Sequence, residues 1–435
     1  MKKILNSDSK GFSEKLNDYI SNNRSTNLDV SEKVKIILES IIFEGDKALS
    51  ELTFKYDNYD IMKEGICVDK KDIDVAYREC DKELVDAIEK AADRISSFHE
   101  RQLPNNISYK DDSNVQLSSR WTPLDSVGLY VPGGKASYPS SVIMTAIPAK
   151  IAKVPEVSMC VPCPKGYLNP SILVAAKVCG VEKIYKIGGA QAIAAMAYGT
   201  NTVKKVNKIF GPGNEWVAEA KRQLFGKVGI DMVAGPSEIL VISDNKCDPN
   251  WIAADLLSQA EHDTESQSIL ITDNLDFAKN VENAINSLIK SLKRKEIAEA
   301  SWNNNGIIIV IEDLMHSIDI INKIAPEHLE ISVENPEEIA KKINNAGSIF
   351  LGRFVPEAIG DYIAGPNHVL PTARTARFSS GISTIDYMRR TSLIKCDSGA
   401  LNEIAPSAIK IAENEGLDAH ALSMKIRMNN FKNEK

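Results

Sequence analysis

The sequence predicts an α/β fold with mostly parallel sheets, divided into more than one domain. Short apolar segments of strand length alternate with amphipathic segments of helix length through the middle of the chain. Such alternation is typical of parallel sheets covered by helices. Glycine-rich turns stand at several strand-to-helix junctions. The chain has 435 residues, too many for one ordinary core, so roughly two to four domains and two sheets are expected.

Two helices are expected before the alternating region. The first begins at Ser31, whose hydroxyl can cap free backbone N–H groups, and Gly45 marks its end. The second runs from Lys82 to about Arg101, because its apolar residues recur at helical spacing. Residues 1–25 are polar and are expected to form a small N-terminal helical appendage.

The alternating region supplies the sheets. The strand candidates are apolar segments at 127–131, 157–161, 184–187, 208–210, 239–242, 269–272, 307–311 and 349–351. Most are separated by helical patterns, among them 170–179, 190–197, 215–225 and 249–260. From residue 387 onward the pattern turns helical.

The composition restricts the class of protein. Hydrophobic residues make up 43% and charged residues 26%, as in a soluble globular protein. A net charge of -7 argues against nucleic acid as the main partner. The N-terminus has no apolar signal region, and no apolar run is long enough to span a membrane. A cytoplasmic protein without membrane or nucleic-acid partners is therefore expected.

The seven cysteines are odd in number and scattered, which suits free thiols in a reducing compartment. Cys160 and Cys163 form a C-x-x-C motif, which can be a redox or metal pair. A buried strand that runs into a proline-rich loop is the favoured alternative, because a thioredoxin-type pair opens a helix and here Pro164 and Gly166 follow.

The six histidines are the most informative residues for function. His262, His328 and His368 each close a short motif that carries carboxylates or amides, and His420 follows Glu415. Scarce imidazoles beside Gln, Glu and Asp suit a zinc site with an acid/base pair. The remaining two, His99 and His316, have no such neighbours.

Gln259 and His262 are three residues apart at the end of a predicted helix, so both can point from one face. Zinc takes about four ligands, and Asp361 with one further histidine would complete the shell. Glutamine is a weak zinc ligand, and a solvated helix end with an incidental histidine is the open alternative.

Glu327 and His328 stand at the entrance of an alternating strand, 329–333. The reference pKa of histidine, about 6.5, suits proton transfer near neutral pH. Neighbours on a strand point to opposite faces, so both reach one substrate only from irregular backbone, which Pro326 favours. A surface glutamate beside a packing histidine is the alternative.

Glycine turns at 133–134, 188–189 and 211–213 follow predicted strands, and the last two of these open helices. Gly235 stands in a fourth glycine turn, with Ser237 available as a donor. A strand-glycine-helix junction presents free N–H groups and the positive end of a helix dipole to a phosphate or pyrophosphate. None is G-x-G-x-x-G, the usual dinucleotide fingerprint. Together they favour a nucleotide-type ligand.

In combination these segments resemble the histidinol dehydrogenase family. The motifs that carry the resemblance are GLYVPGG (128–134), YPSS (138–141), GGAQAIAA (188–195), GPGN (211–214), AGPSE (234–238), DLLSQAEH (255–262), APEHLE (325–330), GPNHVLPT (365–372) and EGLDAHA (415–421). Their common order makes the resemblance far more specific than any single motif, and it extends from about Phe98 to Arg427.

The resemblance implies a zinc-dependent enzyme that oxidises L-histidinol to L-histidine through L-histidinal with two NAD⁺, in the final steps of histidine biosynthesis. It implies one Zn²⁺ per subunit. By position it implies zinc ligands Gln259, His262, Asp361 and His420, the acid/base pair Glu327 and His328, NAD contacts Tyr130, Gln191 and Asn214, and substrate contacts Ser237, His368 and Glu415 beside His328 and the zinc ligands themselves.

The resemblance also implies two incomplete Rossmann-like domains. The first, with the metal and catalytic residues, would comprise 26–129 and 238–381, and the second, with the NAD contacts, 130–237. The segment 382–435 would cross to a second subunit of a homodimer, so that His420 and Glu415 complete the partner's site.

A few positions depart from the family's pattern. Lys153 stands where glycine is usual, Cys163 where proline is frequent, and Ala373 and Arg374 where small glycines are expected. The last two follow His368 and put that loop's conformation in doubt. No catalytic position is lost.

Three other readings stay open at this stage. A zinc hydrolase could use Glu327 to activate water, although it leaves the glycine junctions unexplained. A binding protein with a structural metal would normally use cysteines and no adjacent base. An amino-aldehyde dehydrogenase of other specificity fits the same motifs. Glutamine and aspartate also accept manganese or cobalt.

Overall fold

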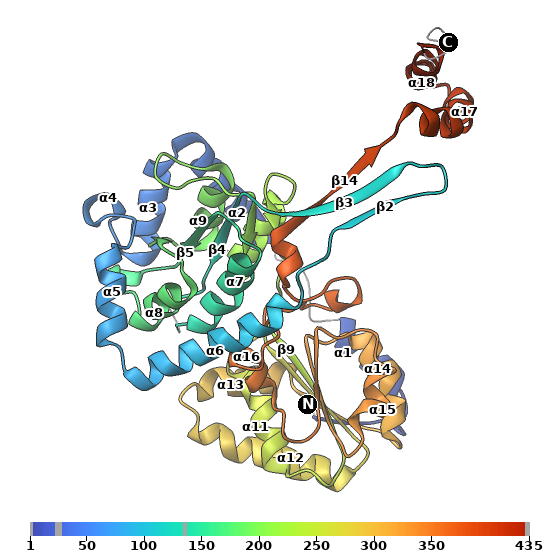
Figure 1. Ribbon diagram of the computed structural model, residues 1–435. Coiled ribbons are helices and arrows are strands. Elements are labelled where there is room, and N and C mark those ends of the chain that lie inside the picture. Colours follow the sequence, from blue (N-terminus) through green and yellow to red (C-terminus); the bar gives the residue numbers. More distant parts are fainter. Residues whose placement is uncertain (1–2, 22–27, 134–136, 431–435) are drawn as a thin grey trace.

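Two parallel β-sheets form the body of the protein, and an antiparallel sheet extends from it as an arm (Figure 1). The computed structural model describes residues 3–21, 28–133 and 137–430. Gly134, the second glycine of the 133–134 turn, and residues 22–25 lie outside them. Within the described residues, no helix combines the length and apolar character needed to cross a membrane.

The six-stranded sheet is parallel throughout. In spatial order its strands are β1 (Ile4–Asn6), β11 (Ile307–Val310), β10 (Gln267–Thr272), β9 (Glu238–Ser243), β12 (His328–Ser332) and β13 (Ser348–Leu351). Every residue of β9, β10 and β12 is buried, because helices cover both faces. One face carries α11 (Pro249–Ala260), α12 (Leu275–Leu288) and α13 (Lys295–Asn305), and the other carries α1 (Phe12–Ser21), α14 (Ser317–Ile324) and α15 (Pro336–Ala340) (Figure 1).

The five-stranded sheet is also parallel. Its order is β6 (Lys183–Tyr185), β5 (Glu156–Cys160), β4 (Ser126–Tyr130), β7 (Lys208–Phe210) and β8 (Gly229–Ile230). One core cluster joins it to α5 (Lys70–Glu79), α6 (Lys82–Glu100), α7 (Pro139–Ile151) and α8 (Pro170–Cys179). A second joins it to α2 (Leu28–Glu44), α3 (Asp46–Asp57), α9 (Gly189–Tyr198) and α10 (Glu215–Leu224). The prediction of mostly parallel sheets is confirmed.

The packing differs from the expected division at the N-terminal end. The start of the chain is not an appendage, since β1 pairs with β11 and Leu16 and Ile20 of α1 are buried in the core. The helices within 28–100 pack around the five-stranded sheet rather than around the six-stranded sheet. In addition, α2 begins at Leu28, so Ser31 lies inside the helix and binds Gln223 of α10.

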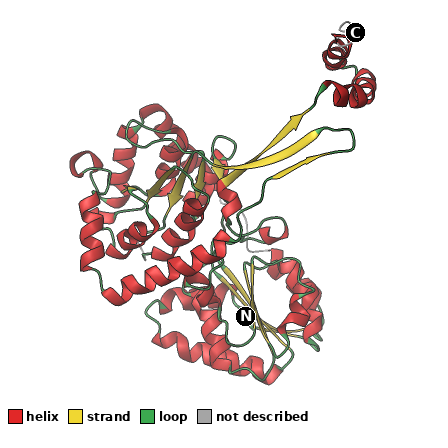
Figure 2. Ribbon diagram, in the orientation of Figure 1, coloured by secondary structure: helices red, strands yellow, loops and turns green. Residues whose placement is uncertain are grey.

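The prediction that the chain is helical from residue 387 onward is wrong for the first part of this segment. β14 (Met388–Lys395) is a strand that pairs antiparallel with β3 (Gln116–Pro123), which in turn pairs with β2 (Ile107–Lys110). Only beyond β14 do α17 (Ser398–Asn414) and α18 (Asp418–Asn430) form, at the far end of the arm (Figure 2). Most residues of β14 are exposed, so its strand conformation comes from pairing with a distant segment that periodicity does not reveal.

Candidate functional site

Most of the sequence-predicted site residues lie near two sheet edges. His328 is the first residue of β12 and Glu238 the first of β9, so this group lies at the amino-terminal edge of the six-stranded sheet. Tyr130 is the last residue of β4, and the turns that follow β6 and β7 open α9 and α10 at the carboxyl-terminal edge of the five-stranded sheet. Residues 231–237 connect the two edges directly.

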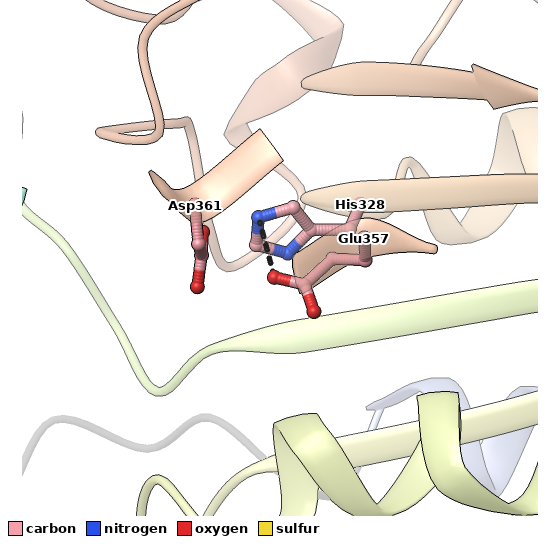
Figure 3. Close-up of side chains that lie close together, drawn as sticks. All are labelled: His328, Glu357 and Asp361. Carbon is pink, nitrogen blue, oxygen red and sulfur yellow. Dashed lines mark ion pairs between the residues drawn. The ribbon is translucent and has the colours of Figure 1, made fainter. Parts of the chain in front are cut away.

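His328 is held as a neutral base. Its Nδ1 lies 2.9 Å from the carbonyl oxygen of Glu238, which can only accept, so Nδ1 carries the proton and Nε2 presents its lone pair. Burial of the ring lowers the pKa of His328 to about 4. Nε2 faces Glu357 Oε1 at 3.7 Å (Figure 3). This unpartnered lone pair can accept a proton or bind a metal.

Two carboxyl groups face this imidazole from the short helix α16 (Glu357–Tyr362). Glu357 and Asp361 are four residues apart, so they share one face of the helix. One potential ligand atom from each of His328, Glu357 and Asp361 lies within 4.8 Å of the others (Figure 3). Burial, and then the neighbouring charge of Asp361, raise the pKa of Glu357. A raised pKa favours the neutral form of Glu357, and a cation bound between these carboxyl groups would favour their ionised forms.

A second pair of carboxyl groups, Glu330 and Asp255, lies near the start of α16, and Glu330 binds its first backbone N–H. The backbone N–H of Glu357 donates to Glu330 at 2.5 Å, and Ser258 Oγ donates to Glu357 Oε2 at 3.2 Å. The side chains of Glu330 and Asp255 bond to each other, and burial raises the pKa of both carboxyls. These buried contacts join α11, β12 and α16, and so hold His328, Glu357 and Asp361 relative to one another.

Two more histidines approach the cluster. Nδ1 of His368 lies 2.9 Å from the carbonyl oxygen of Asp361 and 3.6 Å from its carboxylate. His262 follows α11, and its charge would lower the pKa values of both His328 and His368. The structure thus brings His262, His328, Asp361 and His368 into one electrostatic neighbourhood.

These side chains fit a divalent cation. Gln259 Oε1, His328 Nε2 and Glu357 Oε1 are buried and have no hydrogen-bond partner among the described residues. A buried polar atom without a partner costs roughly 1–3 kcal/mol. A cation between His328 and Glu357 would satisfy both of their atoms with an imidazole and a carboxylate ligand. Sequence reasoning missed Glu357, although its spacing of four residues before Asp361 was a usable signal.

Glu327 lies beside Nδ1 of His328, the ring nitrogen that does not face Glu357. Its Oε2 accepts from the N–H of Glu238 at 2.9 Å, and it lies 3.7 Å from His328 Nδ1. Ala325, two residues earlier, has a left-handed φ of 49°. The backbone before β12 is therefore irregular, as the sequence predicted.

The remaining substrate candidates lie in very different places. Ser237 immediately precedes β9, and its carbonyl oxygen accepts from Gln267 N at 3.0 Å. Glu415 and His420 are exposed at the far end of the arm, in the α17–α18 region, away from β12 and α16 (Figure 1). A single chain does not bring these two residues to the cluster.

The three candidate NAD contacts surround the carboxyl edge of the five-stranded sheet. The hydroxyl of Tyr130 accepts from Gly189 N at the start of α9 at 3.0 Å, and Gln191 is buried in the first turn of that helix. Asn214 caps α10, accepting from Trp216 N and Val217 N. Two helix N-termini thus converge beside one buried tyrosine, an arrangement that suits a pyrophosphate.

Glycine is required in this cradle for close approach. A Cβ on Gly188 would lie 2.4 Å from Cγ of Pro162, and one on Gly211 would lie 2.0 Å from the carbonyl oxygen of Tyr130. The glycine turns therefore allow backbone segments to pack together where the helices open. The arrangement suits the nucleotide-type ligand expected from the glycine turns.

The cysteine motif follows the structural alternative. Cys160 ends β5, and Cys163 stands in the loop that Pro164 continues. Both are free and buried, and burial raises the pKa of the Cys163 thiol to about 11. Inert thiols of this kind serve packing rather than redox chemistry.

The departures from the expected glycines keep a glycine-like backbone. Lys153, Ala373 and Arg374 have φ values of 62°, 52° and 62°, in the left-handed region that costs side chains roughly 1–2 kcal/mol. The N–H of Ala373 donates to Glu238 Oε1 at 2.9 Å. This bond ties the loop after His368 to the first residue of β9.

Comparison with known proteins identifies the family. The sequence matches the histidinol dehydrogenase family over residues 20–428. Histidinol dehydrogenase of Rhodospirillum rubrum is 51% identical over 426 residues, 98% of this chain and 98% of that protein, and that of Brucella suis is 52% identical over 418 residues, 96% and 97%. The crystal structure of histidinol dehydrogenase from Elizabethkingia anophelis has a TM-score of 0.93 at 36% identity and covers 99% of this chain and 98% of its own. The chain therefore belongs to the histidinol dehydrogenase family of NAD-dependent oxidoreductases.

Proposed function

We propose that this protein oxidises L-histidinol to L-histidine through L-histidinal, with two NAD⁺, as the final steps of histidine biosynthesis in the cytoplasm. One observation carries the proposal within the family: His328 is a buried neutral imidazole whose Nε2 faces the acidic cluster. A base held in this way beside a cation-binding group is what oxidation of an alcohol requires.

The proposed metal ligands are Gln259, His262 and Asp361 of one subunit with the partner subunit's His420. Bound Zn²⁺ would act as a Lewis acid that fixes the imidazole and amino groups of the substrate. Glu357 adds a carboxylate beside Asp361. Ser237, His368 and the partner subunit's Glu415 would contact the substrate around this centre.

The proposed dimer follows from the position of the arm. α17 and α18 lie away from the body, and apolar side chains on them are exposed, among them Ile411 at 61%, Leu422 at 57% and Ile426 at 50%. A second copy would cover these side chains while placing its His420 and Glu415 in this chain's site.

The proposed mechanism assigns two proton abstractions to His328 and one to Glu327. In the first oxidation His328 Nε2 takes the hydroxyl proton of the alcohol. His328 then releases this proton to solvent. Glu327 takes a proton from the water that adds to the aldehyde, and the neutral His328 takes the proton of the resulting diol in the second oxidation. NAD⁺, bound near Tyr130, Gln191 and Asn214, would accept the hydride in each oxidation.

NADH formation from L-histidinol by the purified protein tests the proposal. Two NADH per histidinol are expected, with loss of activity on chelation and recovery with zinc. A folded, metal-loaded protein that forms no NADH from histidinol would refute the substrate, and ester or peptide hydrolysis would then be measured for the zinc hydrolase reading.

A further inference from the structure

A buried ion pair is hydrogen-bonded to the loop that precedes α10. The side chains of Lys221 in α10 and Asp231 after β8 form this pair and are 2% and 1% exposed. Lys221 Nζ donates to the carbonyl oxygen of Gly211 at 2.9 Å, and Asp231 Oδ2 accepts from the N–H of Gly211 at 2.7 Å. Both backbone polar groups of one glycine are thus bound by the two halves of one ion pair.

Gly211 lies close to two of the proposed NAD contacts, Tyr130 and Asn214. Gly211 has a φ of 115° and packs directly against the carbonyl of Tyr130. Three residues later Asn214 caps α10. Fixing Gly211 therefore fixes the spacing between Tyr130 and Asn214, two of the three proposed NAD contacts.

Asp231 of this pair is also connected through the backbone to the residues around His328. The other carboxylate oxygen of Asp231 accepts from Met232 N at 2.7 Å. From Met232 the chain continues to Glu238, which binds both Glu327 and His328. Asp231 thus holds the start of the 211–214 loop and the start of the 232–238 segment at a single carboxylate.

Stability alone does not account for a pair of this kind. Desolvation of two buried charges offsets most of their attraction, and apolar residues of similar volume often stabilise a fold as well or better. Hydride transfer, by contrast, needs the reacting atoms within about 3–3.5 Å of each other. A rigid link between the two ligand sites meets that need.

We propose that Lys221 and Asp231 are positioning residues for NAD⁺, which hold the 211–214 loop against Tyr130 and in register with the 232–238 segment. The proposal rests on the proposed function, since it concerns the same dinucleotide site. Neither side chain need touch NAD⁺ to set its affinity.

The test compares this pair with its neighbour on the same helix. Lys221→Met and Asp231→Asn are matched by Arg222→Met and Glu219→Gln, because Arg222 and Glu219 also form an ion pair, at 2.6 Å, but face Ser31 of α2. NAD⁺ binding is measured by calorimetry without histidinol, beside KM for both substrates and zinc content. Variants of the Lys221–Asp231 pair should bind NAD⁺ about tenfold more weakly, as loss of a charged hydrogen bond predicts, with zinc content and KM for histidinol unchanged.

Hydrogen exchange of the 208–217 segment supplies a readout that needs no ligand. The Gly211 amide should exchange slowly in the wild-type protein and in both control variants, and faster in Lys221→Met and Asp231→Asn. Where a single variant does not fold, Lys221→Met/Asp231→Leu, which leaves no unpaired charge, takes its place. Lys221→Arg, which keeps the charge, should recover part of the NAD⁺ affinity.

Three results would overturn the inference. The first is unchanged NAD⁺ affinity and exchange in the Lys221 and Asp231 variants, and the second is an equal loss in the Arg222 and Glu219 controls. The third is failure of the wild-type protein to bind NAD⁺, which would refute the proposed function as well. If the wild-type protein binds NAD⁺ with the expected pattern but does not oxidise histidinol, only the proposed substrate fails.

Discussion

Replacing Gly211 by alanine should displace the loop that carries Asn214. A Cβ at Gly211 would lie 2.0 Å from the carbonyl oxygen of Tyr130, whereas real Cβ atoms essentially never come within 3.0 Å of another atom. The nearest atoms are backbone atoms of Tyr130, which cannot rotate away as a side chain could. Because protein interiors are close-packed, the 211–214 loop or β4 must move by about 1 Å. The φ of 115° adds conformational strain.

Gly226 provides a matched control for the strain alone. Its φ is 97°, and an added Cβ would meet nothing within 4 Å. Gly226→Ala should therefore cost only the conformational term, roughly 1–2 kcal/mol. Gly211→Ala carries that term and the overlap, together roughly 2–5 kcal/mol.

Urea unfolding followed by circular dichroism measures the two stability losses, and calorimetry measures NAD⁺ binding by each folded variant. Gly211→Ala should lose both stability and NAD⁺ affinity, whereas Gly226→Ala should keep the affinity of the wild-type protein. Equal stability losses in the two variants, or unchanged NAD⁺ affinity in Gly211→Ala, would refute the argument from close approach.

Four further predictions concern the site and the dimer. Glu327→Gln should spare oxidation of histidinol more than that of histidinal, measured as separate half-reactions; an equal fall in both would mean that Glu327 does not activate water. Glu357→Gln should weaken zinc binding about 10–100-fold in a chelator competition, as loss of a group beside the ligands predicts, and full retention of zinc would remove Glu357 from the centre. Mixed dimers of a His420→Asn subunit and a Glu327→Gln subunit, each unable to form histidine by itself, should recover about a quarter of wild-type histidine formation on random assembly, because one site of each hybrid is then intact; no recovery would place His420 in its own chain's site. The Arg222 guanidinium lowers the pKa of Glu219 to about 2 from 4.5, so its stabilisation is present above about pH 4.5 and is lost as pH falls toward 2; the difference in Tm between wild type and Glu219→Gln should narrow over that range, and a constant difference would contradict the ion-pair origin.

Much of the fold follows from local patterns in the sequence. The apolar segments at 157–161, 208–210 and 269–272 correspond to β5, β7 and β10, because strands buried on both faces carry continuous apolar runs. Helices such as α8 and α11 agree with their predicted ranges to the residue. The N-terminal end and β14 did not follow, since their conformations depend on pairing with strands hundreds of residues away.

The sequence by itself determined the alternation of strands and helices, the glycine junctions and the motifs that mark the family. Only the tertiary structure decided which nitrogen of His328 faces the cluster, that Glu357 joins Asp361 there, and that Lys221 and Asp231 both bind the backbone of Gly211. The physical reason is that periodicity reports how each segment is buried locally. Hydrogen bonds and charges between segments exist only after folding brings distant residues together.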